Sequence, residues 1–299
     1  MSRSVRVFQV DAFTDHPFAG NPAGVVLDAD ALSDAEMRAI ARELNNGDTA
    51  FLLAPDGSDH ELRVRFFTPR AEAGFVGHAT VAAHAVLRTL GRPAAPRQKQ
   101  GIGIVRVQSE AGDAGFISIA QPPAALRSVV DTQLLAEVLT ALQLHGDELD
   151  PRCPPAIAGS SSARLLLALN EGARLATLQP DLSRLAELSP RIGAAGYFLY
   201  SLRSSIANCD TEARMYCPAL GIPEDPVSGN AHGMLGAHLY ACGQLRVQQQ
   251  RAAFLGAQGH HLGRPGRVRV ALQFEAAELR TVTICGQAAI VFETSIRLP

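Results

Sequence analysis

The sequence contains no tryptophan, and its few tyrosine and phenylalanine residues bring the aromatic fraction to only 5%. Proteins that bind single-stranded nucleic acids stack the bases on aromatic side chains, so this class of protein is disfavoured. The 27 lysine and arginine residues nearly balance the 29 acidic residues, which leaves a formal net charge of −2. Without a basic surplus, neither nucleic acid nor a membrane surface is an expected partner.

Long hydrophobic runs and familiar cysteine spacings are missing as well. No apolar run approaches the roughly 20 residues of a membrane span, and the first residues lack the apolar core of a signal peptide, so we expect a cytoplasmic protein. A P-loop, a dinucleotide-binding fingerprint and a Gly-x-Ser-x-Gly motif are also absent. The cysteines match no zinc pattern, so we expect reduced, buried thiols and no metal site. These cysteines are Cys153, Cys209, Cys217, Cys242 and Cys285.

What the chain does contain is a 47% hydrophobic composition over 299 residues, enough for two domains with their own cores. Its most informative stretch runs from Pro223 to Leu239, where an acidic loop leads into a helix that is apolar or small on nearly every side. Such a helix is predicted to be buried. Ser228 or Asn230 can cap its first turn, and its free N–H groups and positive dipole end suit a bound anion.

The same succession of features occurs about 150 residues earlier. A strand from Arg65 stops at Pro69, a loop with Glu72 follows, and Gly77-His78-Ala79-Thr80 opens a second apolar helix that ends near Gly91. We interpret the repeat as an internal duplication. It predicts two equivalent domains, each with a sheet around a central helix, whose helix N-termini face one another across a cleft.

Strand-like segments far outnumber helices, which favours an α+β fold over a doubly wound α/β fold. We predict two similar domains, each a curved, mostly antiparallel sheet or barrel around its helix. The boundary is placed at Pro122-Pro123, so residues 1–122 form the N-terminal domain and residues 123–287 the C-terminal domain. The last strand, 288–299, is expected to complete the N-terminal domain. Residues 91–101 are expected to form a basic surface loop.

Asp48 is the first candidate for chemistry. A helix predicted over residues 34–44, with Ser33 and Glu36 as a capping box, is broken by Asn45-Asn46-Gly47. Asp48 lies between this break and an apolar strand, so its carboxylate could project into a cleft. The same position also suits an ordinary loop aspartate that caps a turn.

His78 and Asp225 are candidates because each stands at the start of a buried helix. The positive end of a helix lowers the pKa of an imidazole and favours its neutral form, which can donate one hydrogen bond and accept another. Asp225 precedes the second helix and is flanked by Glu224 and Pro226. The ordinary alternatives are a packed or capping histidine and a turn aspartate that stabilises the helix dipole.

Three motifs, spread over most of the chain, resemble the phenazine-biosynthesis PhzF family in content and order. The resemblance implies a diaminopimelate-epimerase-like fold of two similar domains with the site between them, a homodimer, and no cofactor. The best-understood member of that family isomerises trans-2,3-dihydro-3-hydroxyanthranilate. The motifs are Asp11–Thr14 with Phe18–Val26, Phe67–Pro69 with Gly77–Thr80, and Glu224–His232.

Carried over by position, the family's proton shuttle falls on Asp48, its assisting histidine on His78 and its supporting aspartate on Asp225. The resemblance also implies that backbone N–H groups at Gly77, His78, Gly229 and Asn230 hold a substrate carboxylate or a developing negative charge. Asn21 and Ser228 complete the expected substrate-binding set.

This sequence departs from the family pattern at two site positions. The shuttle is usually glutamate, and Asp48 is shorter by one methylene, which withdraws the carboxyl by roughly 1.5 Å. A proton shuttle is sensitive to displacements of that order. The second motif usually ends in Gly-Ser, whereas this chain has Gly229-Asn230, which replaces a hydroxyl with an amide.

The sequence therefore predicts a cofactor-independent isomerase that moves a proton between carbons of a small carboxylated substrate. One alternative is a diaminopimelate-epimerase-like racemase or epimerase, but that branch of the fold has cysteines at the two helix starts, where this chain has Val76 and Ser228. The other alternative is a non-catalytic protein that binds a small ligand in the retained cleft.

Overall fold

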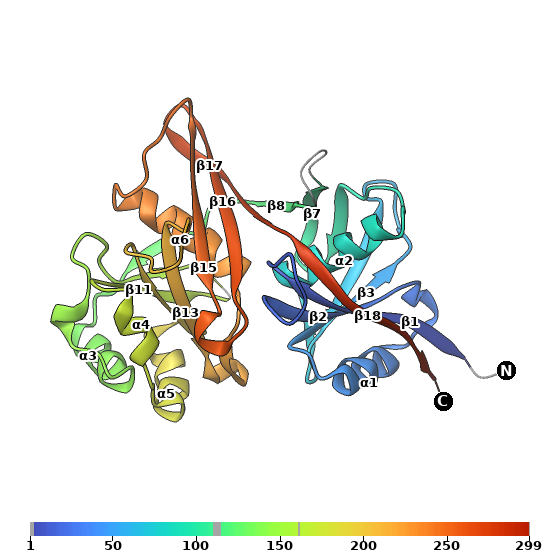
Figure 1. The fold of residues 1–299 in the computed structure, drawn as a ribbon, viewed down its shortest axis with the longest axis horizontal. Helices are drawn as coiled ribbons and strands as arrows, with labels where there is room; N and C mark the ends of the chain where they lie inside the picture. Colours follow the sequence, from blue (N-terminus) through green and yellow to red (C-terminus); the bar gives the residue numbers. More distant parts are fainter. Residues whose placement is uncertain (1–2, 110–114, 161, 299) are drawn as a thin grey trace. The chain divides into compact units, whose positions relative to one another are not determined.

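The computed structural model describes residues 3–109, 115–160 and 162–298 of the chain. It divides into two compact units. Unit 1 comprises Met1–Gln121 and Cys285–Pro299, and unit 2 comprises Pro122–Ile284. In Figure 1 the dark red strand β18 belongs with the blue N-terminal elements of unit 1. None of the helices within the described residues combines the length and the apolar character that crossing a bilayer requires.

Unit 1 is built from one curved sheet and a central helix. Its strands pair in the order β18-β1-β2-β3-β4-β6-β7-β8, and only the β2–β3 and β4–β6 pairs are parallel. Its strands are β1 (Ser4–Ala12), β2 (Asn21–Val26), β3 (Asp48–Leu53), β4 (Leu62–Phe67), β5 (Glu72–Ala73), β6 (Arg97–Gln100), β7 (Gly103–Ser109), β8 (Ile117–Gln121) and β18 (Ala288–Arg297). Its helices are η1 (Ala29–Ala31), α1 (Asp34–Leu44) and α2 (Gly77–Thr89).

The sheet of unit 1 wraps around helix α2. This helix contacts β18, β1, β2 and β3 towards one end of the strand order and β8 at the other end. Its apolar side chains, including Ala82 and Val86, pack in one cluster with Val10, Val25 and Phe66 of the strands. Because hydrophobic strands surround α2, it is apolar on nearly all sides, as the sequence predicts.

Unit 2 repeats this plan. Its strands pair in the order β9-β10-β11-β12-β13-β15-β16, with parallel pairs at β11–β12 and β13–β15. Its strands are β9 (Leu126–Ser128), β10 (Ala156–Ala158), β11 (Arg164–Leu169), β12 (Gly196–Ser201), β13 (Thr211–Cys217), β14 (Ile222–Asp225), β15 (Arg251–Gln258), β16 (Gly266–Glu275) and β17 (Glu278–Gly286), whose last residues belong to unit 1. Its helices are α3 (Thr132–Ala141), η2 (Gly146–Glu148), α4 (Ala173–Thr177), α5 (Leu182–Ile192), η3 (Pro218–Leu220), α6 (Gly229–Ala241) and η4 (His260–Leu262).

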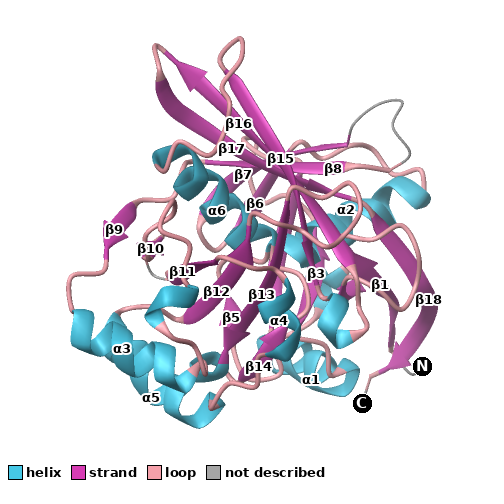
Figure 2. Ribbon diagram, turned by 60° about the vertical axis from the view of Figure 1, so that its left-hand side comes forward, coloured by secondary structure: helices cyan, strands magenta, loops and turns pink. Residues whose placement is uncertain are grey.

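Helix α6 is the central helix of unit 2 and contacts β10, β15 and β16. Gly236 allows this close packing, because a Cβ atom there would lie 3.0 Å from a methyl group of Val270 and 3.3 Å from one of Leu272. Helices α3 and α5 cover a second apolar cluster formed with β11 and β12, and Figure 2 shows these two helices side by side.

The two units share one topology, which confirms the predicted α+β fold with two similar halves. In unit 1, β2-β3-β4-β6-β7 pair as parallel, antiparallel, parallel and antiparallel neighbours, and β11-β12-β13-β15-β16 do the same in unit 2. The central helix follows the third of these strands in each unit, and both central helices span 13 residues. Such agreement in strand order and connection is the expected product of an internal duplication.

The duplication extends to individual side chains. Arg65 on β4 forms two hydrogen bonds of 2.7 Å with the Glu72 carboxylate and lies over the ring of Phe67. Arg214 on β13 bonds Glu224 in the same bidentate way, at 2.8 and 2.7 Å, and lies over the ring of Tyr216. In each unit, this arginine fixes the loop that leads into the central helix.

The prediction of a surface loop over residues 91–101 is wrong for its second half. Residues Arg97–Gln100 form strand β6, which pairs with β4 and β7. Gln98 is fully buried there, where its Oε1 accepts a hydrogen bond from Nε2 of His84 and its Nε2 donates to Oε1 of Gln100. Polar side chains on this short strand hid it from hydrophobic patterning, although Gln98 forms hydrogen bonds inside the unit.

Candidate active site

Asp48 is the first residue of β3, where the preceding turn and the neighbouring strands hold it. Helix α1 ends in a left-handed residue, Asn45, whose N–H donates to Ala41. The next residue, Asn46, exchanges two side-chain hydrogen bonds with Gln9 of β1, at 2.8 and 3.0 Å. These bonds fix the turn, so Asp48 begins the strand in a defined position. Its side chain is 13% exposed.

His78 is the second residue of α2. The residue before the helix, Val76, provides no side-chain cap, so the first turn depends on other partners for its N–H groups. The His78 side chain is 12% exposed, and its Nε2 is among the buried polar atoms that have no hydrogen-bond partner in the described structure. A buried, unpartnered imidazole nitrogen at a helix start is costly for stability and is typical of a functional position.

The structure brings these two side chains together. Nε2 of His78 lies 3.7 Å from Oδ2 of Asp48, beyond hydrogen-bond distance but within the range of an ion pair. Burial lowers the pKa of His78 to about 4, so the imidazole is neutral at pH 7. The sequence led us to expect a neutral imidazole from the positive end of the helix, whereas burial is the cause here.

Asn21 lies on the strand next to Asp48. Residue Ala23 of β2 pairs with Asp48, and Asn21, two residues earlier, points to the same face of the sheet. Asn21 is only 4% exposed. Sequence reasoning did not single out Asp11, whose buried carboxylate accepts the backbone N–H of Phe18 at 2.7 Å and so shapes the loop that leads to Asn21.

In unit 2, Asp225 closes strand β14, which pairs with β13. Its neighbour Glu224 is engaged by Arg214, and that guanidinium also donates to the carbonyls of Leu175 and Leu178 at 2.7 and 3.2 Å. Glu224 therefore has a structural partner of opposite charge and helps to hold the loop in which Asp225 lies.

The start of α6 has the capping predicted for it. The Ser228 hydroxyl accepts the N–H of Ala231 at 3.2 Å, so Ser228 is the N-cap and Gly229 and Asn230 are the first helical residues. His232 lies in the first turn and is fully buried, with Nδ1 2.8 Å from the Ser228 carbonyl oxygen. A carbonyl only accepts, so Nδ1 carries the proton in this bond. Burial lowers the pKa of His232 to about 4.

Gln258 holds the loop before α6, a role that sequence reasoning missed. Its Oε1 accepts the N–H of Ser228 at 3.1 Å, and its Nε2 donates to the Asp225 carbonyl at 2.7 Å. Its side chain is buried at the end of β15. The sequence carries one weak signal for this role, a polar residue at the end of an otherwise apolar run.

Within unit 1 the structure brings Asp48 and His78 together and places Asn21 on the same face of the neighbouring strand. Within unit 2, Asp225 ends β14, Ser228 caps α6, and Gly229 and Asn230 begin it. Gly77 opens α2 as Gly229 opens α6, so His78 and Asn230 occupy matching places in the two units.

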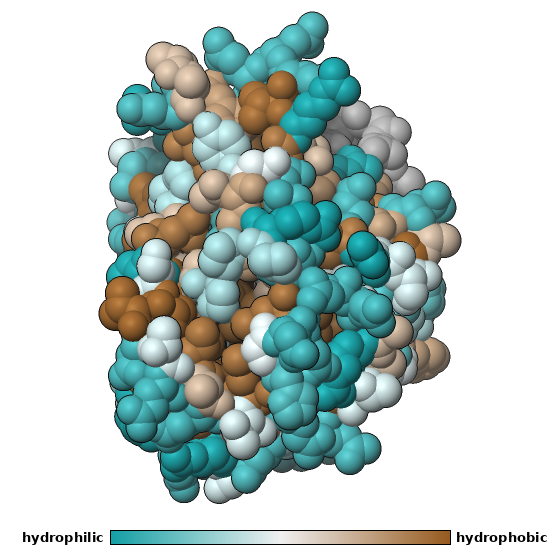
Figure 3. All heavy atoms as spheres, turned by 90° about the vertical axis from the view of Figure 1, so that its left-hand side faces the viewer, coloured by the Kyte–Doolittle hydropathy of each residue, from teal (hydrophilic) through white to brown (hydrophobic). Residues whose placement is uncertain are grey.

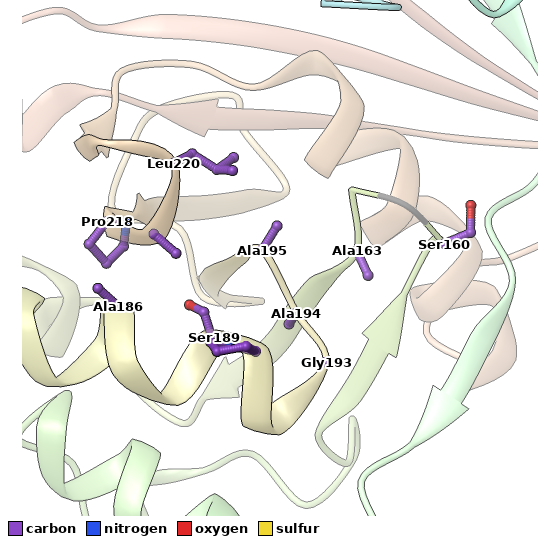
Figure 4. Close-up of a pocket in the computed structure, with 11 residues that line it drawn as sticks. Ser160, Ala163, Ala186, Ser189, Gly193, Ala194, Ala195, Pro218 and Leu220 are labelled. Carbon is purple, nitrogen blue, oxygen red and sulfur yellow. The ribbon is translucent and has the colours of Figure 1, made fainter. Parts of the chain in front are cut away.

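A hollow elsewhere on unit 2 offers no such chemistry. It lies between the end of α5 and η3, and Figure 4 shows Ser189, Ala195, Pro218 and Leu220 around it. None of its lining residues in the described structure has a titratable side chain. The face shown in Figure 3 carries hydrophobic patches separated by hydrophilic residues, as ordinary protein surfaces do. The hollow therefore lacks a general acid or base.

Comparison with known proteins places the chain in a family. The family model described as phenazine biosynthesis-like protein, PhzC-PhzF, matches residues 10–294. The chain belongs to this family. A protein of Salmonella typhimurium named uncharacterized isomerase YddE is 39% identical over 291 residues, which cover 96% of each chain.

Two further PhzF relatives bear on activity and fold. The trans-2,3-dihydro-3-hydroxyanthranilate isomerase of Pseudomonas aeruginosa is 28% identical over 290 residues, covering 96% of this chain and 98% of that protein. The crystal structure of a Bacillus anthracis PhzF family protein superposes with a TM-score of 0.88 at 24% identity, covering 99% of this chain and 100% of the other. The chain is thus an isomerase or epimerase of the PhzF type with the fold of that family.

Proposed function

We propose that this protein is a cofactor-independent isomerase that moves a proton between carbons of a small carboxylated substrate, with Asp48 as the proton shuttle. The observation that carries the proposal is the pair formed by Asp48 and His78. Two side chains from different elements lie 3.7 Å apart, both mostly buried, and the imidazole nitrogen has no hydrogen-bond partner in the described structure.

In the proposed reaction the Asp48 carboxylate removes a proton from a carbon next to a carbonyl or an unsaturated group. The electron pair of the broken C–H bond shifts into that group, and the protonated Asp48, whose proton can exchange with solvent, returns a proton to another carbon as the double bond moves. The substrate is therefore neither oxidised nor reduced, and the reaction requires no redox partner. Neutral His78 can donate a hydrogen bond to the developing negative charge without first losing a proton.

We propose that the start of α6 acts on the same substrate. The N–H groups of Gly229 and Asn230 lie at the positive end of a buried 13-residue helix, which suits a carboxylate. The corresponding N–H groups of Gly77 and His78 stand at the start of α2. Asn21 and Ser228 would add polar contacts, and Asp225 would support the charge distribution during proton transfer.

The test is whether the protein moves carbon-bound protons of a substrate or exchanges them with deuterium from the solvent. The purified protein would be incubated in D2O with a panel of small carboxylates, including dihydro-hydroxyanthranilate, and carbon-bound protons followed by NMR. Asp48→Asn should lose deuterium incorporation or double-bond movement by at least about 100-fold, because a general acid–base group contributes roughly 10²–10⁴-fold. Asp147→Asn, the same change at an exposed site in η2, is the control.

The outcomes separate the proposal from its two rivals. Full turnover in Asp48→Asn would remove Asp48 from the mechanism. Exchange at the α-carbon of an amino acid would favour a racemase, although the residues that cap α2 and α6, Val76 and Ser228, carry no thiol. Ligand binding without exchange of any carbon-bound proton would indicate a binding protein.

The length of the shuttle side chain provides a second test. Asp48→Glu adds one methylene and advances the carboxyl by roughly 1.5 Å, which would bring it to or past hydrogen-bond distance of the His78 imidazole. Such a displacement should lower kcat by about 10- to 100-fold, while the KM changes less. An unchanged kcat would show that the position of the carboxyl does not limit the reaction.

We further propose that the enzyme is a cytoplasmic homodimer, as the PhzF resemblance and the composition suggest. Light scattering of the purified protein would measure its mass in solution. A mass equal to the 31.7 kDa of one chain at micromolar concentration would contradict the dimer.

A further inference from the structure

Unit 2 contains a cluster of metal-ligating side chains that the proposed reaction does not use. Cys153, His238 and Cys242, hereafter the Cys2His cluster, place their ligating atoms within 4.8 Å of one another. His238 lies in the last turn of α6 and Cys242, four residues later, is the C-cap residue, so the two side chains share one side of the helix end. Cys153 comes from the loop before β10, a strand that α6 contacts. Figure 2 shows α6 and β10.

The loop that carries Cys153 is rigidly held. The backbone N–H of Cys153 donates to the Asp150 carbonyl at 3.1 Å, and the Asp150 carboxylate accepts the backbone N–H of Arg152 at 3.0 Å. Arg152 also pairs with that carboxylate through its guanidinium. Asp150 is 2% exposed and Cys153 1% exposed, so the thiol occupies a fixed, buried position.

The geometry fits the cage that a tetrahedral zinc ion requires. With Zn–S and Zn–N bonds of about 2.3 and 2.1 Å, two ligating atoms lie roughly 3.6 to 3.8 Å apart. The Cys242 sulfur lies 3.8 Å from Nδ1 and 3.9 Å from Nε2 of His238. Because all ligating atoms of the cluster lie within 4.8 Å of one another, a contraction of at most about 1 Å brings them to zinc geometry.

A fourth polar group adjoins the cluster. The Tyr200 side chain is fully buried, and its hydroxyl is among the buried polar atoms that lack a hydrogen bond of ordinary geometry in the described structure. The hydroxyl lies near the Cys153 thiol, and the Tyr200 ring packs edge-on against His238 with 6.3 Å between the ring centroids. A buried hydroxyl without a partner costs free energy that a nearby ligand or its bound water would recover.

We propose that the Cys2His cluster binds one zinc ion, with the Tyr200 hydroxyl or a water molecule in the fourth position. Two thiolates and one imidazole form a set of soft and borderline donors, which selects such a cation over calcium or magnesium. Binding releases the two thiol protons to solvent and forms two Zn–S bonds and one Zn–N bond. Cys242 is partly exposed and gives the cation a route from solvent.

The bound ion would tie the C-terminal end of α6 to the loop before β10. Cys242 is the C-cap residue of this helix, and the residues proposed for substrate binding are at its other end. The zinc site is therefore separate from the proposed reaction, and the two proposals can fail independently.

The test measures zinc on the intact chain. Protein stripped with a chelator and kept reduced would be titrated with Zn²⁺, and with Co²⁺ to detect thiolate-to-cobalt charge-transfer absorption. The wild type should bind one equivalent, and Cys153→Ser and His238→Gln should weaken binding by at least about 100-fold, since outer-shell partners alone contribute roughly 10- to 100-fold. Cys209→Ser, the same chemical change at a partly exposed cysteine of unit 2 outside the cluster, should bind like the wild type.

A measurement on the wild type makes the proposal independent of how the variants fold. Zinc should slow alkylation of Cys153 and Cys242 and leave the alkylation of Cys209 unchanged, as read by mass spectrometry of peptides. Absence of stoichiometric zinc, or equal binding in Cys153→Ser and Cys209→Ser, would overturn the proposal. A disulfide between Cys153 and Cys242 that forms in preference to the zinc complex would also overturn it and assign the cluster to redox chemistry.

Discussion

Each unit has a buried imidazole in the first turn of its central helix, at the second residue of α2 and at the fourth residue of α6. His78 and His232 lie in the first turns of α2 and α6, and burial lowers the pKa of each from 6.5 to about 4. Each has a buried Nε2 without a hydrogen-bond partner in the described structure. A neutral histidine at the start of a central helix is thus built into both halves, and among the described residues a carboxylate lies in ion-pair range of His78 but not of His232.

The lowered pKa of His232 makes stability depend on pH. The unfolded chain binds a proton at this histidine near pH 6.5, but the folded chain does so only near pH 4. The contribution of neutral His232 is therefore complete above pH 6.5, is lost as the pH falls through this window, and amounts to about 3 kcal/mol. Below about pH 4 both states are protonated and the dependence from this group ends.

His232→Asn tests this contribution, because the amide can still donate to the Ser228 carbonyl but cannot titrate. Urea unfolding at pH 7, 5.5 and 4.5 should show a shallower loss of unfolding free energy in the variant than in the wild type. His16→Asn, at a side chain that is 63% exposed, is the control and should keep the wild-type slope. Equal slopes for His232→Asn and the wild type would contradict the assignment.

Site residues that lie next to a helix end could be predicted from the sequence. Residues whose role depends on contacts with distant parts of the chain could not. Asp48 follows a helix break and His78 begins a buried helix, and both features are visible in order along the chain. Gln258 acts on Ser228 and Asp225 across about 30 residues, through a side chain whose target no local pattern reveals. The 3.7 Å distance between Asp48 and His78 likewise results from strand pairing and not from spacing in the sequence.

Elements were predicted well where their ends carry chemical signals. The capping box of Ser33 and Glu36 predicted the bounds of α1, and the structure contains both of its hydrogen bonds. Strand β6 was missed because Gln98 and Gln100 read as solvent-facing, whereas both are buried: Gln98 bonds His84 and Thr80 of α2, and Gln100 accepts from Gln98. Propensity describes single residues, and such a strand depends on the network that surrounds it.

Packing between β15 and α6 leads to a prediction at the scale of these elements. A Cβ atom at Gly256 would lie 2.3 and 2.5 Å from ring atoms of His232, which is itself packed edge-on against Phe198. The ring cannot move aside without disturbing that contact. Gly256→Ala should therefore lower the free energy of unfolding by about 1–3 kcal/mol, as overpacked core positions do.

The matched control for Gly256→Ala is Gly146→Ala, in η2 of the same unit. A Cβ atom there would meet nothing within 4 Å, and the residue lies outside the left-handed region. Its unfolding free energy should stay within about 0.5 kcal/mol of the wild type. Chemical denaturation of both variants measures the difference, and equal stabilities would show that β15 and α6 tolerate a larger separation.

At the scale of the whole molecule, the two units share one topology but bury their shared arginine–glutamate pair to different depths. Both units have the same five-strand order, the same position for the central helix and the same arginine–glutamate pair before it. The sequence showed the repeat because strand, proline, acidic loop and glycine recur in order. It could not show how deeply each copy of the pair is buried, since that depends on the elements that each unit has added.

The arginine pair allows the two halves to be compared in one experiment. Arg214 is 10% exposed, and it bonds two carbonyls of the segment around α4 besides Glu224, whereas Arg65 is 25% exposed and bonds the more exposed carboxylates of Glu72 and Asp34. Arg214→Met leaves a buried carboxylate and two carbonyls without their donor, so it should cost about 3–5 kcal/mol. Arg65→Met should cost about 1 kcal/mol or less, because its partners regain water.

Hydrogen exchange read by peptide mass spectrometry reports on each unit separately, so it measures both costs. Methionine keeps the apolar stem that lies over Tyr216 or Phe67, and the comparison therefore isolates the charge and its hydrogen bonds. Loss of protection should be large in unit 2 for Arg214→Met and small in unit 1 for Arg65→Met. If the two losses were equal, the contribution of the ion pair to stability would not depend on its burial. The duplicated motif would then stabilise both halves equally.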